Sequence, residues 1–319
     1  MNLLNIYKKL KTDMQFIERE LYKSVHSPDP LMTEASSHLL KAGGKRIRPI
    51  FVLLGGKSGN YDINRLKYIA VALELVHMSS LVHDDVVDDA DIRRGQLTVK
   101  SKWDNRVAMY TGNYILSQAV GYISKLENVR IHQILSKAIV NMCIGEIEQI
   151  KCLYEWNQSL KTYLLRIKRK TALLMAISCQ LGALACGAKE DIVQALYRYG
   201  YNVGMAFQIT DDILDLTGTE QQLGKPAGND LLQGNITLPV LLSMENASVK
   251  NHIIQEFNSG HPDIKHIIDL VLNSGGIHRA KEIAQKYLHK ARESLNHLHD
   301  HDSKDIFSQI ARFIEQRTF

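Results

Sequence analysis

Aspartates at positions i, i+1 and i+4 occur twice in this chain. The two groups are Asp84, Asp85 and Asp88, and Asp211, Asp212 and Asp215. On a helix, the first and third members of each group lie on one face, one turn apart. Carboxylate oxygens are hard ligands that suit magnesium, whose shell is usually completed by water and substrate phosphates. The repeated spacing therefore predicts a magnesium site for a phosphorylated substrate.

A single group of this kind is more simply explained as an acidic helix end in solvent. The repetition argues against that explanation, because both groups follow hydrophobic stretches. Residues 203–209 precede the second group, so its aspartates are expected at the end of a mostly buried helix. If the two groups face each other across a helical bundle, they can hold several metal ions around one diphosphate.

Basic side chains occur in a glycine-rich bend and after the first aspartate group. Residues 43–49 read GGKRIRP, and Arg93 and Arg94 follow the aspartates. Guanidinium groups bind phosphate oxygens in pairs, and lysine adds a point charge. The bend lacks the GxxxxGK[ST] and GxGxxG patterns of nucleotide loops. The alternative for the arginine pair is a set of salt bridges with the neighbouring aspartates.

Helices must position these groups. Residues rich in Leu, Ala, Ile, Lys and Glu form long stretches, only 6 prolines occur, and no hairpin dipeptides separate the stretches. Residues 64–89 lack proline and glycine and predict a helix roughly 40 Å long. Residues 43–44 are expected to end the preceding helix, and Pro49 to lie in the first turn of the next. The other predicted helices span 31–42, 50–55, 103–126, 131–152, 159–186, 189–217, 237–246, 250–258, 263–273, 277–298 and 303–316.

The pattern indicates an all-α fold. No linker rich in Pro, Gly or Ser divides the chain, so a single domain over residues 1–319 is expected. Residues 1–25 predict an N-terminal amphipathic helix that can pack on the chain's own core or at a subunit interface. Its apolar seam consists of Leu3, Tyr7, Leu10, Met14, Ile17 and Leu21.

The composition narrows the classes of molecule that the protein is expected to bind. The formal net charge of +5 suits small anionic substrates or an anionic membrane surface and does not indicate nucleic acid. The four cysteines form no CxxC pair and predict reduced, buried thiols in a cytoplasmic protein. Residues 171–188 are uncharged but fall short of the roughly 20 strongly apolar residues of a membrane span. A buried helix and at most a peripheral membrane contact are expected.

These motifs resemble those of the trans-isoprenyl diphosphate synthase family, and the similarity covers nearly the whole chain. The matching residues are GGKRIRP at 43–49, His77, LVHDDVVDDADIRRG at 81–95, GEIEQ at 145–149, KRKT at 168–171, FQITDDILD at 207–215 and GKPAGNDLLQGNITLP at 224–239. The resemblance implies an isoprenoid-synthase-type bundle of long helices around a central apolar cavity. It also implies an enzyme that joins isopentenyl diphosphate to an allylic diphosphate.

The resemblance implies a role for each matched residue. Three magnesium ions would be bound by Asp84, Asp85, Asp88, Asp211, Asp212 and Asp215. The allylic diphosphate would contact Arg93, Lys225 and, beside them, Lys170. Isopentenyl diphosphate would contact Lys45, Arg48, His77 and Arg94. Thr171 and Gln208 would turn oxygen dipoles toward the allylic cation, and Asn235 stands where the family often has lysine.

The implied chemistry is ionisation, condensation and elimination. Metal ions and basic side chains would stabilise the departing diphosphate, while apolar walls exclude water from the carbocation. Isopentenyl diphosphate would then attack, and the departed diphosphate is the expected base.

The chain is also similar to the large catalytic subunits of bacterial two-component hexaprenyl or heptaprenyl diphosphate synthases. This similarity implies a small noncatalytic partner subunit in a heterodimer, with a homodimer as the alternative. The expected product is heptaprenyl diphosphate made from farnesyl diphosphate for a menaquinone side chain, and otherwise hexaprenyl diphosphate.

Ser79 and Ser80 are the candidates for control of product length, because they lie about one turn before Asp84 on the expected helix. Short-chain members of the family often carry an aromatic residue in this region. The alternative is that these small residues only allow close helix packing.

Two other functions are weighed against this one. A terpene cyclase resembles the chain at the first aspartate group, but cyclases lack the isopentenyl site that Lys45, Arg48 and Arg94 provide. A noncatalytic partner subunit lacks the aspartate groups, and both are present here.

Overall fold

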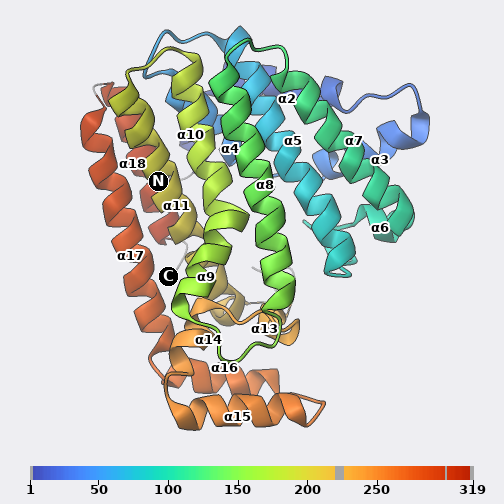
Figure 1. Cartoon of the computed structure of the whole chain (residues 1–319), viewed down its shortest axis with the longest axis vertical. Helices are drawn as coiled ribbons and strands as arrows, with labels where there is room; N and C mark the ends of the chain where they lie inside the picture. The colour runs from blue at the N-terminus through green and yellow to red at the C-terminus, as the bar shows by residue number, and fades with distance from the viewer. Residues whose placement is uncertain (1–2, 220–225, 299, 317–319) are drawn as a thin grey trace. The chain divides into compact units, whose positions relative to one another are not determined.

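Helices make up nearly all regular structure in this computed structural model, which describes residues 3–219, 226–298 and 300–316 (Figure 1). The N-terminal elements are α1 (Leu3–Lys9), α2 (Lys11–Ser24), α3 (Pro30–Lys41), α4 (Ile47–Gly56), α5 (Ile63–Val87), β1 (Ile92–Arg93), β2 (Gln96–Leu97), α6 (Val99–Lys102) and α7 (Asn105–Ile123). There follow α8 (Val129–Lys151), α9 (Leu160–Ile167), the π-helical turn η1 (Lys168–Ala172), α10 (Leu173–Ala185) and α11 (Glu190–Thr217). The C-terminal elements are α13 (Asn229–Leu232), α14 (Leu238–Ser243), α15 (Ala247–Asn258), α16 (Ile264–Asn273), α17 (Gly276–Ser294), the 3-10 turn η2 (Leu295–His297) and α18 (His301–Gln316). The predicted all-α class is confirmed.

The chain divides into two compact units, and each is described by itself. Unit 1 contains residues 1–139, 174–200 and 295–307, and unit 2 contains residues 140–173, 201–294 and 308–319. Each unit is thus assembled from three separated stretches of sequence. The expected single domain over the whole chain stays a prediction.

The helix α5 is the core element of unit 1. Asp62 caps its first turn by accepting a hydrogen bond from the Asn64 amide at 2.9 Å. Residues 69–76 are buried on every side of the helix, and α7 and α4 pack beside it (Figure 1). The helix ends where Asp88 donates its amide to the Asp84 carbonyl at 2.8 Å. The predicted span of 64–89 is confirmed to within two residues at each end.

A short hairpin follows α5 and was missed by the sequence prediction. Ile92 pairs with Leu97 across the antiparallel strands β1 and β2. Arg94 and Gly95 form the two-residue loop, and both have positive φ, 53° and 73°. Positive φ at both loop residues matches the twist of a tight hairpin. The hairpin therefore reverses the chain directly after the first aspartate group.

The N-terminal apolar seam packs on unit 1 itself. Leu10, Met14, Ile17 and Leu21 are all buried there, which is the first of the two alternatives. The single helix predicted for residues 1–25 is wrong, because Leu10 leaves helical geometry between α1 and α2. Its side chain nevertheless stays buried, so the backbone turns without taking the seam out of the core.

An aromatic group joins distant parts of the sequence in unit 1. The ring centroids of Phe51, Tyr199 and Phe307 lie 4.6 to 6.2 Å apart. The Tyr199 hydroxyl donates to the Phe307 carbonyl at 2.6 Å, so its polar end is satisfied while its ring is buried.

The helix predicted for residues 159–186 is helical over residues 160–185, but the prediction missed a change of helix type within it. A π-helical turn at residues 168–172 separates α9 from α10. Such turns occur frequently at functional sites, because the wider turn changes which side chains share a face. The buried helix expected within residues 171–188 is confirmed as α10.

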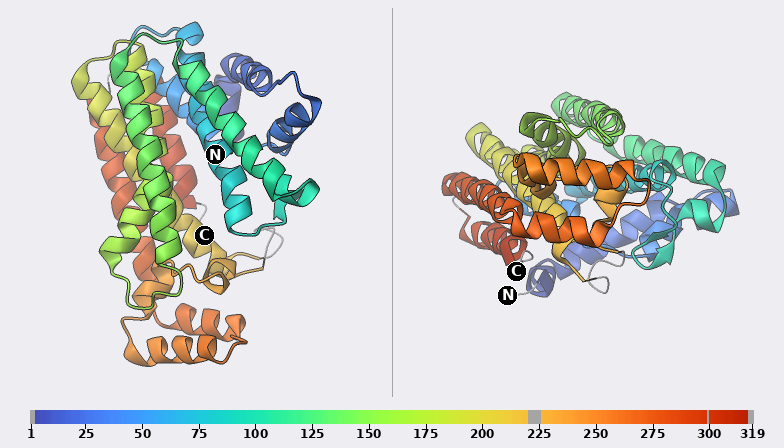
Figure 2. Two further views of the ribbon diagram at one scale, coloured as in Figure 1. Left: turned by 45° about the vertical axis from the view of Figure 1, so that its right-hand side comes forward. Right: turned by 90° about the horizontal axis from the view of Figure 1, so that it is seen from below.

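The helix α11 approaches the π-helical turn closely. A Cβ at Gly204 would lie 2.5 Å from the Cα of Ala172, so only glycine permits this distance. Apolar residues of α9, α11, α14, α16 and α17 form the core of unit 2. Beside it, α15 and α16 pack as a short helical pair (Figure 2).

Two further expectations have clear outcomes. All four cysteines are free thiols, but Cys143 is exposed on α8, so the prediction that it is buried is wrong. The predicted helix 103–126 begins only after Asp104, which caps α7 by accepting a hydrogen bond from the Val107 amide at 2.7 Å.

No helix in the described ranges is both long and apolar enough to cross a membrane.

We predict that Gly204→Ala destabilises the protein by about 1–3 kcal/mol, the usual cost of overpacking a close-packed site. The added methyl group must displace the backbone of Ala172. Gly121→Ala in α7 is the matched control, because a Cβ there meets no atom within 4 Å. The control should be neutral or stabilising, since alanine favours helices. Urea denaturation of both variants measures the difference, and equal stabilities would contradict the prediction.

Candidate active site

The first aspartate group lies at the C-terminal end of α5. Asp84 and Asp88 are half-buried one turn apart, as predicted, and Asp85 is buried. Arg93 Nε donates to Asp85 Oδ1 at 2.5 Å. Burial raises the pKa of Asp85, and the charge of Arg93 opposes that shift. The salt-bridge alternative therefore holds for Arg93.

Arg94 has a different environment. Its Nη1 donates to the carbonyl of Gly43 in the glycine-rich bend. A Cβ at Gly44 would lie 2.7 Å from that nitrogen, so glycine is needed there for the guanidinium to approach. The hairpin thus brings the Arg94 side chain into contact with the bend at residues 43–49.

Arg48 and Arg94 form a cationic group in unit 1, and His77 lies beside them. Arg48 Nε is buried and has no hydrogen-bond partner within the described residues. Burial lowers the pKa of Arg48 to about 10, and the charge of Arg94 adds to the shift. Burial and both arginines hold the pKa of His77 well below its usual range, so His77 is neutral at pH 7. Adjacent cations with an unsatisfied donor suit a bound polyanion.

The bend also carries Lys45 and Arg46. Lys45 is exposed. The side chain of Arg46 is buried and pairs with Glu18 and Glu74. The structure therefore brings three of the four residues predicted for isopentenyl diphosphate together, with Lys45 on the same bend.

The second aspartate group belongs to unit 2, where Asp212 is 3% exposed. The Tyr163 hydroxyl donates to Asp212 Oδ2 at 2.6 Å, and Gln208 Nε2 donates to Oδ1 at 2.9 Å. The Thr171 hydroxyl donates to Gln208 Oε1 at 2.6 Å. Burial raises the pKa of Asp212 to about 7, and the two donors oppose the shift. Thr171, Gln208 and Asp212 are thus joined by a chain of hydrogen bonds, as expected of side chains that belong to one site.

Asp215 anchors the segment that follows α11. Its carbonyl accepts from the Gly228 amide at 2.7 Å, and its Oδ2 accepts from the Asp230 amide at 3.3 Å. The charge of Asp230 raises the pKa of Asp212, so these carboxylates lie close together. The Asn235 amide donates to the Asp230 carbonyl at 2.8 Å.

Sequence reasoning missed Tyr163 and Asp230. Asp230 lies inside the segment 224–239 that carries the family resemblance, which was a usable signal. Tyr163 lies 49 residues before its partner Asp212 in sequence, and no local pattern connects them. Only the packing of α9 on α11 places its hydroxyl at the carboxylate.

Lys170 lies on the π-helical turn. Its Nζ donates to Glu146 at 3.2 Å and to Gln149 at 3.0 Å, both from the GEIEQ segment of α8. Lys225, predicted to bind the allylic diphosphate, lies outside the described residues.

The donor set fits a divalent metal that is shared with a substrate. Within the described ranges, no three His, Cys, Asp or Glu side chains come together as a closed metal site. Asp84 and Asp88 instead offer a pair of hard oxygen ligands. Magnesium usually binds one or two carboxylates and completes its shell with water and phosphate.

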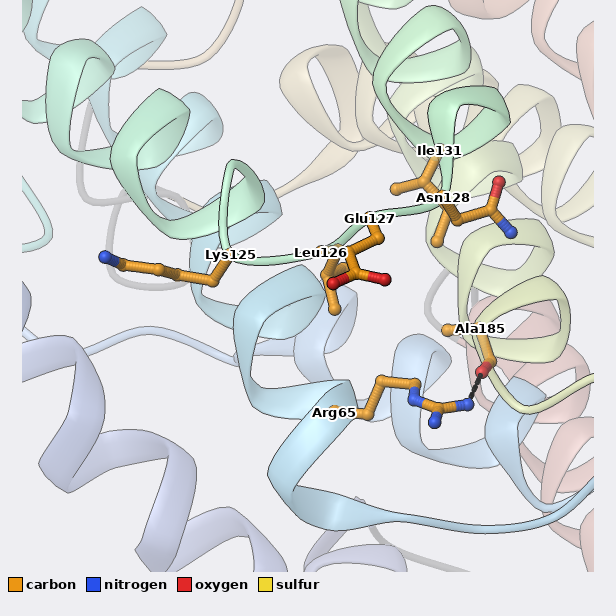
Figure 3. A pocket seen from close by; sticks show the side chains of 7 residues that line it. All are labelled: Arg65, Lys125, Leu126, Glu127, Asn128, Ile131 and Ala185. Atoms are coloured by element: carbon orange, nitrogen blue, oxygen red, sulfur yellow. Dashed lines mark hydrogen bonds between the residues drawn. The ribbon is translucent and has the colours of Figure 1, made fainter.

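A pocket of about 350 Å³ in unit 1 lies away from the first aspartate group of the same unit (Figure 3). Arg65 lines it and donates to the Ala185 carbonyl at 2.9 Å. Arg65 and Asp84 are at opposite ends of α5, so roughly 28 Å separates their backbones along the axis. The pocket is therefore separate from the first aspartate group.

Comparison with known proteins extends these observations. Residues 29–271 match the family model described as "Polyprenyl synthetase". The chain belongs to the polyprenyl synthetase family. Like the other members of this family, it is a transferase that elongates prenyl chains with the aid of a divalent metal.

Individual relatives agree with the family assignment. Heptaprenyl diphosphate synthase component 2 of Bacillus subtilis is 52% identical over 98% of this chain and 90% of its own length. The protein of the same name from Geobacillus stearothermophilus is 51% identical over the full length of both chains. The crystal structure of heptaprenyl diphosphate synthase from Staphylococcus aureus matches with a TM-score of 0.91 and 39% identity, covering 100% of this chain and 99% of that one.

We predict that Tyr163→Phe lowers kcat/KM at acidic pH. Without the hydroxyl, the pKa of Asp212 rises above about 7, because a donor that stabilises the ionised form is lost. A larger share of the carboxyl is then protonated near neutrality. The acid limb of the pH profile should move upward, with roughly tenfold lower kcat/KM at pH 6.5 if the shift is one unit. Activity should recover toward pH 9.

Tyr110→Phe is the matched control, because Tyr110 is 68% exposed on α7. Its pH profile should coincide with that of the wild type. An unshifted acid limb in Tyr163→Phe would show that the hydroxyl does not govern the ionisation of Asp212.

Proposed function

We propose that this chain is the catalytic subunit of a heptaprenyl diphosphate synthase. It would extend farnesyl diphosphate with isopentenyl diphosphate and supply a menaquinone side chain in the cytoplasm. The observation that carries the proposal is the near-complete overlap with two component 2 chains at 51–52% identity. Both aspartate groups are retained, which a noncatalytic subunit would not need.

The cationic group of unit 1 is assigned to isopentenyl diphosphate. Arg48 and Arg94 would bind its phosphate oxygens, and Lys45 would add a third charge from the bend. Neutral His77 can donate a hydrogen bond without adding charge. The buried Nε of Arg48 supports this assignment, because binding an anion would satisfy a donor that otherwise has no hydrogen-bond partner.

The aspartate groups are assigned to the allylic diphosphate through three magnesium ions. Magnesium, when bound, would neutralise the charge that develops on the departing diphosphate. The proposed ligands are Asp84, Asp85, Asp88, Asp211, Asp212 and Asp215. Arg93, Lys170 and Lys225 would contact the same diphosphate, with Arg93 exchanging its bond to Asp85 for phosphate oxygens.

Thr171 and Gln208 suit the stabilisation of a carbocation. A threonine hydroxyl has one proton to donate, and that of Thr171 is directed to Gln208. Toward any other neighbour the Thr171 oxygen therefore presents only lone pairs. The Gln208 amide nitrogen donates a hydrogen bond to Asp212, which fixes the orientation of the amide. The oxygens of Thr171 and Gln208 therefore keep one orientation as the allylic C–O bond breaks. This preorganisation is what electrostatic catalysis requires.

The test is incubation with labelled isopentenyl diphosphate, farnesyl diphosphate and magnesium, with and without the partner component, followed by product sizing. Heptaprenyl diphosphate is the expected product. Hexaprenyl diphosphate would correct the length, and a cyclic hydrocarbon made without isopentenyl diphosphate would favour a terpene cyclase. Activity in excess chelator would contradict the magnesium assignment.

The partner is proposed to dock on one face of α8. Four aliphatic side chains there, in consecutive turns, are 43–54% exposed. They are Val140, Ile144, Ile147 and Ile150, and the exposed Cys143 lies among them. A continuous apolar face of this kind marks an interaction surface. The name "component 2" of the two relatives favours a second subunit as the occupant over another copy of this chain.

We predict that Ile147→Glu abolishes assembly with the small partner component while leaving the chain folded. A charge in an apolar interface is left unpaired, whereas an exposed substitution changes stability by only about 0.5 kcal/mol. Gln133→Glu, an exposed polar position on the same helix, is the control. Sedimentation velocity of the mixed components measures assembly. A dimer of the chain alone that makes the full-length product would overturn the heterodimer.

The two candidates for control of product length, Ser79 and Ser80, have different surroundings. The Ser79 hydroxyl is buried and donates to the Gly112 carbonyl of α7 at 2.8 Å. The Ser80 hydroxyl donates to the His77 carbonyl within its own helix at 2.8 Å, and Ser80 is half-buried. Position 79 therefore contributes to close packing of α5 on α7. Position 80 is the better candidate for a residue along the path of the growing chain.

We predict that Ser80→Phe gives a folded, active enzyme whose products shorten toward geranylgeranyl diphosphate, because the ring obstructs elongation. Ser79→Phe should instead lose about 1–3 kcal/mol of stability, since the ring must displace α7. Chromatography of the labelled products and thermal unfolding measure the two effects. Unchanged product length in an active Ser80→Phe enzyme would place the path elsewhere.

A further inference from the structure

The bend at residues 43–49 contains a residue in an unfavourable backbone conformation. Arg46 has a φ of 42°, in the left-handed region that residues with a side chain rarely adopt. Such conformations persist only where surrounding contacts determine them, and they concentrate at functional sites. The contacts of Arg46 therefore indicate what the bend is built to do.

The guanidinium of Arg46 uses nearly all of its donors. Nε and Nη2 bind the two oxygens of Glu18 at 3.1 and 3.0 Å, and Nη1 donates to Glu74 at 3.3 Å. Nη2 and Nη1 also donate to the carbonyls of Leu40 and Gly43 at 3.3 and 3.4 Å. These partners come from α2, α5, the end of α3 and the bend itself. Arg46 thus joins the bend to three helices of unit 1.

The neighbours of Arg46 carry the assigned isopentenyl site. Lys45 and Arg48 flank it in sequence, and Glu74 lies one turn before His77 on α5. The hydroxyl of Tyr7 on α1 donates to the Lys45 carbonyl. The N-terminal helices therefore hold the bend through Tyr7 and Glu18, although neither residue belongs to the candidate active site.

We propose that Arg46, clamped by Glu18 and Glu74, is a positioning residue that orients Lys45 and Arg48 toward isopentenyl diphosphate. This inference rests on the proposed function. It separates Arg46 from the phosphate-binding cations of the bend, because its donors are already directed to carboxylates and carbonyls. It also gives the N-terminal helices a part in substrate recognition.

The charge balance supports this division. Glu74 is a buried carboxylate whose charge acts on Arg46, Arg48 and Arg94. Among the described residues, Arg46 alone forms an ion pair with it. The donors of Arg46 are thus engaged, although Glu74 Oε2 is buried and has no hydrogen-bond partner among the described residues. Arg48, by contrast, keeps its buried Nε donor for an incoming anion.

Glu18→Gln is the informative variant, because it weakens the clamp and leaves the buried Arg46–Glu74 pair in place. The KM for isopentenyl diphosphate should rise about five- to tenfold, the scale of one charge-assisted contact. The KM for farnesyl diphosphate and kcat should change less than about twofold. Tyr7→Phe should give the same pattern more weakly, and Glu18→Asp should restore part of the affinity. Glu34→Gln, which breaks the ion pair with Lys102, is the control.

Calorimetric titration of isopentenyl diphosphate onto each variant needs no turnover. It therefore tests the inference separately from the proposed function, which fails instead if the wild type makes no prenyl product. Weaker binding in Glu18→Gln but not in Glu34→Gln supports the positioning role. Unchanged binding of isopentenyl diphosphate to Glu18→Gln overturns the positioning role. An equal rise of the KM values for both substrates, together with a lower melting temperature, also overturns it, because that pattern marks a general loss of structure.

Discussion

Charged groups removed from water constrain this structure more than any other feature. The carboxylate of Asp212 lies almost fully buried between two hydrogen-bond donors, and the guanidinium of Arg46 lies between two carboxylates. A buried charge is tolerated only when it is paired or hydrogen-bonded. Helices that supply those partners must therefore keep their spacing and rotation. In this way the chemistry of the site determines how the surrounding helices pack.

Glycine allows the close approaches that this arrangement needs. Gly204 brings α11 against the π-helical turn that carries Thr171. Gly44 leaves space for the Arg94 guanidinium. A side chain at position 204 would clash with the backbone of Ala172, and one at position 44 would push the Arg94 guanidinium aside. The effect of the two glycines on the site is indirect, because each acts through the orientation of a neighbouring residue.

The parts that sequence could predict share a physical basis. Helix spans followed from long stretches without proline or glycine, such as residues 64–89, and from breaking residues such as the glycines at 43–44, because both are local signals. Asp84 and Asp88 were placed correctly because helical geometry relates positions four residues apart. The π-helical turn and the Arg94–Gly95 hairpin were missed, since each is imposed by tertiary contacts. The partners of Asp212 and Arg46 were missed for a similar reason, as Tyr163 and Glu18 are distant in sequence.

The discontinuous composition of unit 1 has a consequence for how the chain folds. Its aromatic group combines Phe51 and Tyr199 with Phe307, which lies 12 residues before the last residue of the sequence. During synthesis, the N-terminal helices emerge from the ribosome long before that ring is available. Contacts between such distant residues cost loop-closure entropy and form slowly. Unit 1 can therefore be completed only after residue 307 has been translated, 256 residues after Phe51. Until then the apolar surface that Phe307 covers stays open to chaperones and to aggregation.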